Sequence, residues 1–191
     1  MKSLLLAALV LFSGHAFGQN TGELFEALRE SGEKYQIIGT VCEQVAKIKM
    51  AQEYQAPEYD VVTGIAYRDD ERTIGELDVV VISKRTHKAI VVAEVKCWKN
   101  LRGARNKAQD QRSRFQKTIK RGTKIELACT DGSCQYRRGD FDSVEKFLSI
   151  SQEGGRDAGF EMELPYSLDE LMDLRMRLMQ CQERNECKRS H

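Results

Sequence analysis

The chain has 191 residues, of which 41% are hydrophobic and 31% are charged, and its formal net charge is +1. This length fits one domain with a substantial core, and the overall charge alone indicates no partner. No apolar run approaches the ~20 residues that a membrane-spanning helix needs, which argues against a membrane-embedded protein.

The first 18 residues have the order of a secretory signal peptide. Lys2 precedes the apolar run Leu4 to Phe12, and the small residues Ala16 and Gly18 follow. This order predicts cleavage after Gly18, and the alternative is a buried N-terminal helix. We therefore expect an exported protein, periplasmic or secreted, with no membrane association in its mature form. Residues 19–191 would form a single domain.

Two helices are expected before the first strand. Residues 21–29 form a short amphipathic pattern, and a longer helix runs from about residue 38 to residue 55, before Pro57. Glu43 lies on this second helix, four residues before Lys47, so a surface ion pair is one interpretation of its role.

Three strands follow, at residues 59–67, 74–83 and 89–98, and they are separated by charged turns. The central parts of the second and third strands are nearly continuous apolar runs. Such runs are typical of strands that are covered on both faces.

A helix over residues 100–121 precedes a strand over residues 123–130. The helix is long enough to be the crossover of a β-α-β unit, which predicts parallel pairing of the strands on either side of it. Three further elements are expected: a short helix at residues 141–150, a strand at 160–164 and a helix at 168–182.

Basic side chains are concentrated around the helix at residues 100–121. Between Lys96 and Lys124 there are eleven Lys or Arg residues and one acid, Asp110, so this segment carries +10 and the rest of the chain about −9. A charge block of this size attracts a polyanion although the whole chain is near neutral. We expect it to hold phosphates without reading sequence. The candidate nucleic-acid-binding residues are Lys99, Arg102, Arg105, Lys107, Arg112 and Arg114.

Six cysteines lie after the signal peptide, and an even number in an exported chain indicates disulfides. The candidates are Cys42, Cys97, Cys129, Cys134, Cys181 and Cys187. Fifteen connectivities are open. Two pairs, 129 with 134 and 181 with 187, are close enough for small loops, which would leave 42 and 97 to each other. The spacings lack companion histidines, so a structural zinc site is the weaker interpretation.

Two carboxylates and a lysine lie on the second and third predicted strands. Glu94 and Lys96 share a strand face because successive side chains alternate, and Asp78 is one hairpin away. Magnesium prefers hard oxygen ligands and keeps several waters, so two carboxylates and substrate phosphate oxygens suffice. The pattern predicts a Mg²⁺ site, with Mn²⁺ as a substitute. Asp78 and Glu94 would be ligands, and Lys96 would position the attacking water or stabilise developing charge.

Four motifs in a fixed order carry a family resemblance. They are Gly39-x-x-x-Glu43-x-x-Ala46, Gly75-Glu76-Leu77-Asp78, Glu94-Val95-Lys96 and Gln111-x-x-x-Phe115. With these motifs, about residues 39–130 resemble the PD-(D/E)xK nuclease superfamily in its resolvase-like and RecB-like branch. Leu77 stands where the superfamily name has proline, and Phe115 stands where some members have tyrosine.

The resemblance implies an α/β, restriction-endonuclease-like core of order α-β-β-β-α-β, with a mixed central sheet flanked by helices and stabilised by disulfides. Residues 131–191 would be a C-terminal extension. It also implies a metal-dependent endonuclease that hydrolyses DNA with little sequence preference, with RNA left open. The Val95 carbonyl would be a further metal ligand, Glu43 would bind the metal directly or through water, and Gln111 would belong to the catalytic set. Glu76 is expected to face away or lie at the rim.

Two other functions remain open at this point. One is a nucleic-acid-binding protein with a nuclease-like fold and no turnover, and the other is a disulfide-stabilised exported module that binds another protein. Trp98 would suit base stacking, but a single Trp at a strand end is more often a core residue. The sequence does not indicate an oligomeric state.

Overall fold

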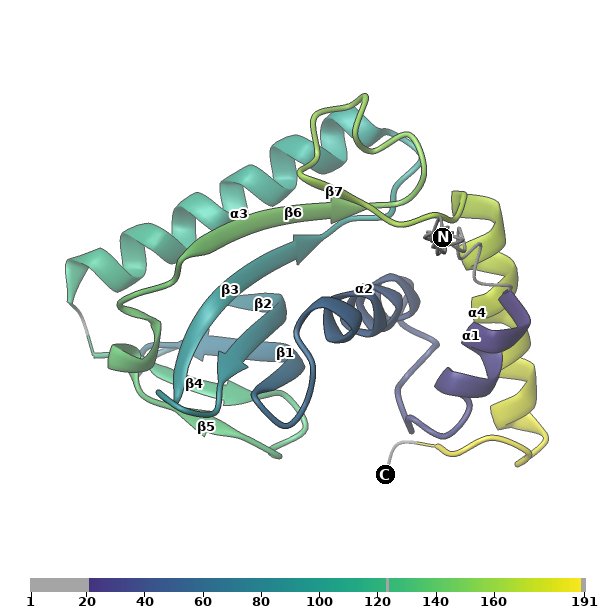
Figure 1. Cartoon of the computed structure of the whole chain (residues 1–191), viewed down its shortest axis with the longest axis horizontal. Coiled ribbons are helices and arrows are strands. Elements are labelled where there is room, and N and C mark those ends of the chain that lie inside the picture. Colours follow the sequence, from purple (N-terminus) through teal and green to yellow (C-terminus); the bar gives the residue numbers. More distant parts are fainter. Residues whose placement is uncertain (1–20, 123, 190–191) are drawn as a thin grey trace, which may run out of the picture.

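The computed structural model describes residues 21–122 and 124–189. The signal-peptide interpretation of residues 1–18 lies outside this range. Across the described residues the chain forms one mixed sheet of seven strands with four α-helices (Figure 1). The expected mixed α/β class is therefore confirmed.

The strand order in the sheet is β5-β4-β1-β2-β3-β6-β7. Pairing is antiparallel from β5 through β3, whereas β3 with β6 and β6 with β7 are parallel. The strands are β1 (Tyr59–Arg68), β2 (Thr73–Ser83), β3 (Lys88–Val95), β4 (Glu126–Cys129), β5 (Gln135–Tyr136), β6 (Lys146–Ser151) and β7 (Met162–Glu163).

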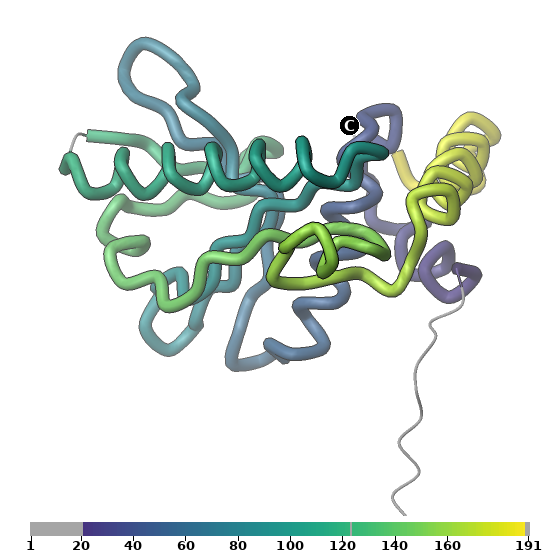
Figure 2. Tube along the Cα trace, turned by 90° about the horizontal axis from the view of Figure 1, so that it is seen from above, coloured from purple at the N-terminus to yellow at the C-terminus, as the bar shows by residue number. Residues whose placement is uncertain are grey.

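The helices cover the two faces of the sheet unequally. They are α1 (Thr21–Leu28), α2 (Thr40–Glu53), α3 (Leu101–Arg121) and α4 (Leu168–Glu183), with a 3₁₀ turn, η1, at Arg138–Phe141. The long helix α3 runs across one face, and α2 lies against the other. Helices α1 and α4 lie side by side beyond α2, at one end of the molecule (Figures 1 and 2).

The alternating side chains of β2 explain why helices cover both faces of the sheet. Val79 and Val81 pack in the cluster that contains α1, α2 and α4, whereas Val80 and Ile82 pack in the cluster beneath α3. The apolar run in β2 therefore serves two cores, as expected for a strand that is covered on both faces.

Two expectations for the second half of the chain are wrong. The strand after α3 is β4, and it pairs antiparallel with β1 instead of parallel with β3. The second half of the predicted helix at residues 141–150 is strand β6, which is the parallel neighbour of β3. In β6, Phe147 packs toward the α3 side, while Leu148 and Ile150 pack toward the α2 side. This burial on both faces is typical of an interior strand.

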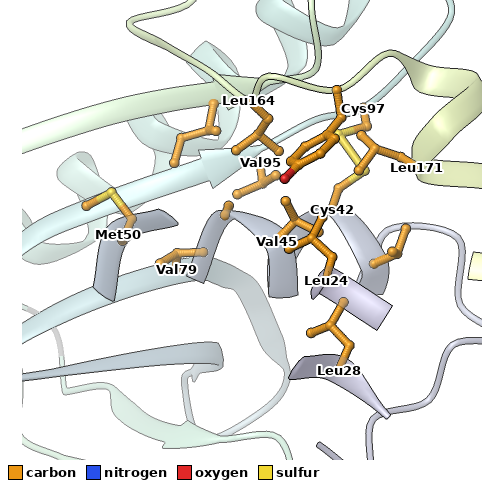
Figure 3. Packing of buried hydrophobic residues seen from close by; sticks show 14 of the residues in the cluster. Leu24, Leu28, Cys42, Val45, Met50, Val79, Val95, Cys97, Leu164 and Leu171 are labelled. Carbon is orange, nitrogen blue, oxygen red and sulfur yellow. A yellow bond between two sulfur atoms is a disulfide. The ribbon is translucent and has the colours of Figure 1, made fainter. Parts of the chain in front are cut away.

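All six cysteines are paired among the described residues. The disulfides are Cys42–Cys97, Cys129–Cys134 and Cys181–Cys187, with Cα–Cα separations of 6.3, 5.0 and 5.3 Å. Figure 3 shows the first of them inside the α2-side core, beside Val95 and Leu171. The two short loops agree with the close sequence spacing, and Cys42–Cys97 ties α2 to the chain that follows β3.

Within residues 21–122 and 124–189, no helix is long and apolar enough to cross a membrane.

Candidate active site

The sheet register brings the two candidate carboxylates together. Val79 of β2 pairs with Ala93 of β3, so the next position in each strand places Asp78 beside Glu94. Glu94 in turn pairs with Ser149 of β6. The candidate site therefore lies across the middle strands of the sheet, where backbone hydrogen bonds fix the spacing of both acids.

Lys96 joins both acids into one cluster. Its Nζ lies 2.5 Å from Asp78 Oδ2 and 3.5 Å from Glu94 Oε2, and it donates a 3.0 Å hydrogen bond to the Val95 carbonyl. Asp78 Oδ2 also accepts a 2.7 Å hydrogen bond from the Val95 amide. The side chains of Asp78 and Lys96 are only 9% and 11% exposed. The cluster is thus a nearly buried charged group and not the solvated strand edge that an isolated E-x-K pattern could form.

Burial and mutual charge shift the titration of this cluster. Burial raises the pKa of Glu94, the negative charge of Asp78 raises it further, and Lys96 only partly opposes this. For Lys96 burial favours the neutral amine, but the charges of Asp78 and Glu94 outweigh burial and the pKa is raised. Lys96 therefore stays charged, and Glu94 readily takes up a proton when no second cation is close.

Glu43 approaches this cluster from α2. Its carboxylate turns back toward the start of the helix, where a Cβ at Gly39 would lie 2.9 Å from Oε1. Burial raises the pKa of Glu43 to about 8, and the neighbouring charge of Asp78 contributes in the same direction. Glu43 is thus electrostatically coupled to Asp78 and Lys96.

Glu76, which is exposed, and Gly64 lie beside the site, and the sequence interpretation did not name Gly64. Burial and the charge of Asp78 raise the pKa of Glu76, and Glu76 in turn raises that of Glu43. Gly64 of β1 has φ +68°, and a Cβ there would lie 3.2 Å from Glu76 Oε1. A glycine inside a strand is the signal for such a close approach, and the sequence carries it at position 64.

The two residues of the Gln111-x-x-x-Phe115 motif on α3 have different surroundings. Gln111 Oε1 is buried and has no hydrogen-bond partner among the described residues. Phe115 is 1% exposed and makes ring contacts with Tyr67, Phe141 and Phe147. Phe115 therefore anchors α3 in the core and presents no polar group to a substrate.

The basic residues around α3 have different surroundings. Lys99, Arg102, Lys107 and Arg114 are exposed, and Arg114 makes a long, 3.5 Å hydrogen bond to a backbone carbonyl. Two others are tied to the β6–β7 region: Arg105 donates to the Gly159 carbonyl, and Arg112 pairs with Glu161 and donates to the Phe147 carbonyl. Four of the six predicted contacts are therefore open to a polyanion, while Arg105 and Arg112 also hold the fold together.

The donor atoms at the site fit a hard divalent cation, with one restriction. Glu94 Oε1 is buried without a hydrogen-bond partner in the described part of the chain, so an acceptor oxygen is left for a cation. Two carboxylates and a carbonyl, from Asp78, Glu94 and Val95, meet the needs of Mg²⁺, which keeps several waters. However, no group of three His, Cys, Asp or Glu side chains in residues 21–122 and 124–189 is arranged to hold a metal ion alone. The Lys96 ammonium is the cation that these oxygens contact.

Comparisons with protein-family models, with curated proteins and with solved structures find no match to this chain.

Proposed function

We propose that the protein is an exported, metal-dependent nuclease that hydrolyses phosphodiester bonds of DNA with little sequence preference. The observation that carries the proposal is the buried cluster of Asp78, Glu94 and Lys96 on adjacent strands, with an unpartnered oxygen on Glu94. Perturbed acids and a lysine in one cluster are typical of functional sites. The exposed basic residues on α3 supply a surface for the phosphate backbone.

Each residue of the cluster has a separate part in this proposal. A bound Mg²⁺ or Mn²⁺ supplies a water of lowered pKa and neutralises charge on the phosphate. The metal ion would be held by carboxylate oxygens of Asp78 and Glu94 and by the carbonyl oxygen of Val95. Lys96 holds its ammonium next to the same oxygens, where it orients a water or pairs with a phosphate oxygen. Glu43 lies on the α2 side of these groups and accepts a proton readily near pH 8.

The observed topology supports the restriction-endonuclease-like core in a modified form. Elements α2, β1, β2, β3 and α3 follow one another as the resemblance implies, and β6 is the strand that runs parallel to β3. In this assignment β4 and β5 are an addition beside β1, and the core extends from about residue 39 to residue 151, beyond the expected end at residue 130.

Export is proposed on two grounds. The first 18 residues have the order of a signal peptide. The described cysteines form three disulfides, which persist in oxidising compartments such as a periplasm or the extracellular space.

The test is a cleavage assay on purified, oxidised protein with plasmid DNA, single-stranded DNA and a matched RNA. We expect degradation of DNA with magnesium and none with EDTA. Glu94→Gln should remove the activity, whereas Asp60→Asn, which changes a surface acid paired with Lys84, should retain it. Cleavage by Glu94→Gln at the wild-type rate would show that the site is assigned wrongly.

One observation favours a second candidate, a nucleic-acid-binding protein without turnover. The Lys96 ammonium already contacts Asp78, Glu94 and the Val95 carbonyl, which are the oxygens that a metal ion would need. Salt-sensitive DNA binding with no cleavage in magnesium or manganese would favour this candidate over the nuclease.

A further inference from the structure

The chain has a single tryptophan, and it is exposed beside the candidate site. Trp98 is 44% exposed, so the expectation that it belongs to the core is wrong. It follows Lys96 by two residues. Two peptide units separate their Cα atoms by at most about 7.6 Å. The ring of Trp98 is therefore accessible to a ligand that binds at the charged cluster.

The backbone that carries Trp98 is fixed on both sides. Gln152, which is 4% exposed, donates from Nε2 to the Trp98 carbonyl at 2.9 Å, and Ser151 donates to the Lys96 carbonyl at 2.7 Å. Between them, Cys97 is joined to Cys42 of α2. The indole is therefore presented by a backbone that is held to β6 and α2, and not by a free loop.

Positive charge continues directly from Trp98 into α3. Lys99 and Arg102 are exposed, and the segment from Lys96 to Lys124 carries ten more basic than acidic side chains. Binding of single-stranded nucleic acids combines a basic surface that follows the phosphates with aromatic rings on which bases stack. Both components lie here within a few residues of Lys96.

We propose that Trp98 is a stacking platform for an unpaired base, and that the substrate at this site is a single-stranded nucleic acid. The proposal rests on the proposed nuclease function, because it places the scissile phosphate near Lys96. In a duplex, both faces of each internal base are covered by its neighbours, so only an unpaired base offers a face to the indole. Stacking tolerates any base, which agrees with low sequence preference.

The single tryptophan allows a direct test by intrinsic fluorescence. The full oxidised protein is titrated with a 20-nucleotide dT oligomer, a matched rU oligomer and a relaxed, covalently closed circular duplex DNA, which has neither free ends nor hairpin loops. EDTA is present, so that cleavage does not interfere. Because the fluorescence excited at 295 nm comes from Trp98 alone, we expect strong quenching with one or both single strands and little with the circular duplex. The two oligomers show whether the unpaired strand is DNA or RNA.

Variants separate stacking from general binding. Trp98→Ala should weaken the affinity for a labelled single strand about 5- to 150-fold, the range found for loss of one base–aromatic stack. Trp98→Phe keeps a ring and should recover most of the affinity. Met176→Ala removes another exposed apolar side chain, 53% exposed on α4, and should bind as the wild type does.

Three results would overturn the proposal: no quenching by either single strand, equal quenching by the circular duplex, or equal affinities of Trp98→Ala and wild type. The outcome is distinguishable from that of the proposed function. Quenching without metal-dependent cleavage contradicts the nuclease and keeps the stacking site, whereas cleavage without quenching contradicts the stacking site alone.

Discussion

The disulfide between Cys42 and Cys97 joins the residue before Glu43 to the residue after Lys96. It closes a loop across 55 positions of sequence, and both cysteines are buried at the α2-side core (Figure 3). Glu43 lies on a helix and Lys96 at the end of a strand, so no secondary-structure hydrogen bond fixes their relative position. The disulfide is the covalent link that does so.

Loss of this disulfide should reduce cleavage more than loss of another one. In the chain-entropy model a 55-residue loop contributes about 4 kcal/mol to the free energy of unfolding and a 6-residue loop about 2 kcal/mol. Cys42→Ser/Cys97→Ser should therefore be less stable, and at temperatures where it is still folded it should cleave DNA more slowly because Glu43 moves relative to Lys96. Urea unfolding and initial cleavage rates measure the two effects.

The matched control is Cys181→Ser/Cys187→Ser, which opens the loop at the end of α4. This variant should keep the cleavage rate of the folded protein. Equal losses of rate in the two double variants, after correction for the folded fraction, would argue against a positioning role for Cys42–Cys97.

Two substitutions within the charged cluster should differ in their effect on stability. Lys96→Met leaves the Asp78 carboxylate buried without its cation, and breaking such a pair costs about 3–5 kcal/mol of unfolding free energy. Glu94→Gln resembles the protonated acid that the raised pKa favours, so at pH 6 it should change stability by less than about 1 kcal/mol while removing metal-dependent cleavage. Urea unfolding of both variants gives the comparison. A Glu94→Gln variant as unstable as Lys96→Met would contradict the assignment of Glu94 as a readily protonated acid.

The sequence was informative where its pattern was long and regular. Strands β1, β2 and β3 and helices α2, α3 and α4 are confirmed within a few residues. The helices have apolar residues at helical spacing, and β2 and β3 are apolar runs bounded by charged turns. Asp78, Glu94 and Lys96 could be grouped because the two strands form a hairpin. Strand β6 was missed because Ser149 and Ser151 interrupt its apolar run, although both are buried.

The regular alternation of strands fails at one place beside the site. In β1, Val61 packs on the α2 side and Ile65 on the α3 side, although both have odd numbers, and Gly64 with its positive φ lies between them. In β2, Val79 and Leu77 differ in the same way on either side of Asp78. The face that Glu76 occupies therefore could not be deduced by counting in steps of two. Exposure of Trp98 depends on the path of the chain after β3, which local pattern does not encode.

Gly64 should be more sensitive to substitution than a glycine of similar backbone conformation. In Gly64→Ala the Cβ would lie 2.9 Å from Thr130 Oγ1 and 3.2 Å from Glu76 Oε1, at φ +68°. Gly132 has φ +77° with no atom within 4 Å of its Cβ position, so Gly132→Ala bears only the backbone cost of about 1–2 kcal/mol. We expect the larger loss of unfolding free energy in Gly64→Ala, together with reduced cleavage. If urea unfolding showed equal losses of unfolding free energy in Gly64→Ala and Gly132→Ala, the close contacts of the new methyl group at position 64 would not contribute.

Substitution of Arg102 should mainly affect nucleic-acid binding, and substitution of Arg112 should mainly affect stability. Arg102 is exposed, so Arg102→Ala should weaken oligonucleotide binding and lower the slope of log affinity against log salt concentration by about 1. Arg112 pairs with Glu161 at 3.0 Å and donates to the Phe147 carbonyl at 3.2 Å. Arg112→Ala should instead lower the free energy of unfolding by about 1–3 kcal/mol, because it leaves these acceptors without their donor. Anisotropy titrations across a sodium chloride series and urea unfolding test the pair, and a larger slope change for Arg112→Ala would reverse the assignment.

The raised pKa of Glu43 should make stability depend on pH. Burial raises this pKa to about 8 from an ordinary value of 4.5, so between these values the folded protein binds a proton that the unfolded chain has released. Stability must then fall as pH rises through this window, by at most about 1.4 kcal/mol per pH unit for one group, and level off above pH 8. Glu43→Gln keeps the shape of the side chain but has no group that titrates in this range.

We therefore expect Glu43→Gln to be close to wild type in unfolding free energy at pH 5 and more stable than wild type at pH 8. Metal binding should show the reverse dependence in the wild type, because the cation competes with protons at Glu43 and Glu94 and its affinity rises as these acids ionise. Urea unfolding at both pH values, without metal and with 10 mM magnesium, measures both effects. The control is Glu145→Gln, an exposed acid on the loop before β6. If the difference between Glu43→Gln and wild type stayed constant from pH 5 to pH 8, Glu43 would be an ordinary surface acid and its place at the site would have to be abandoned.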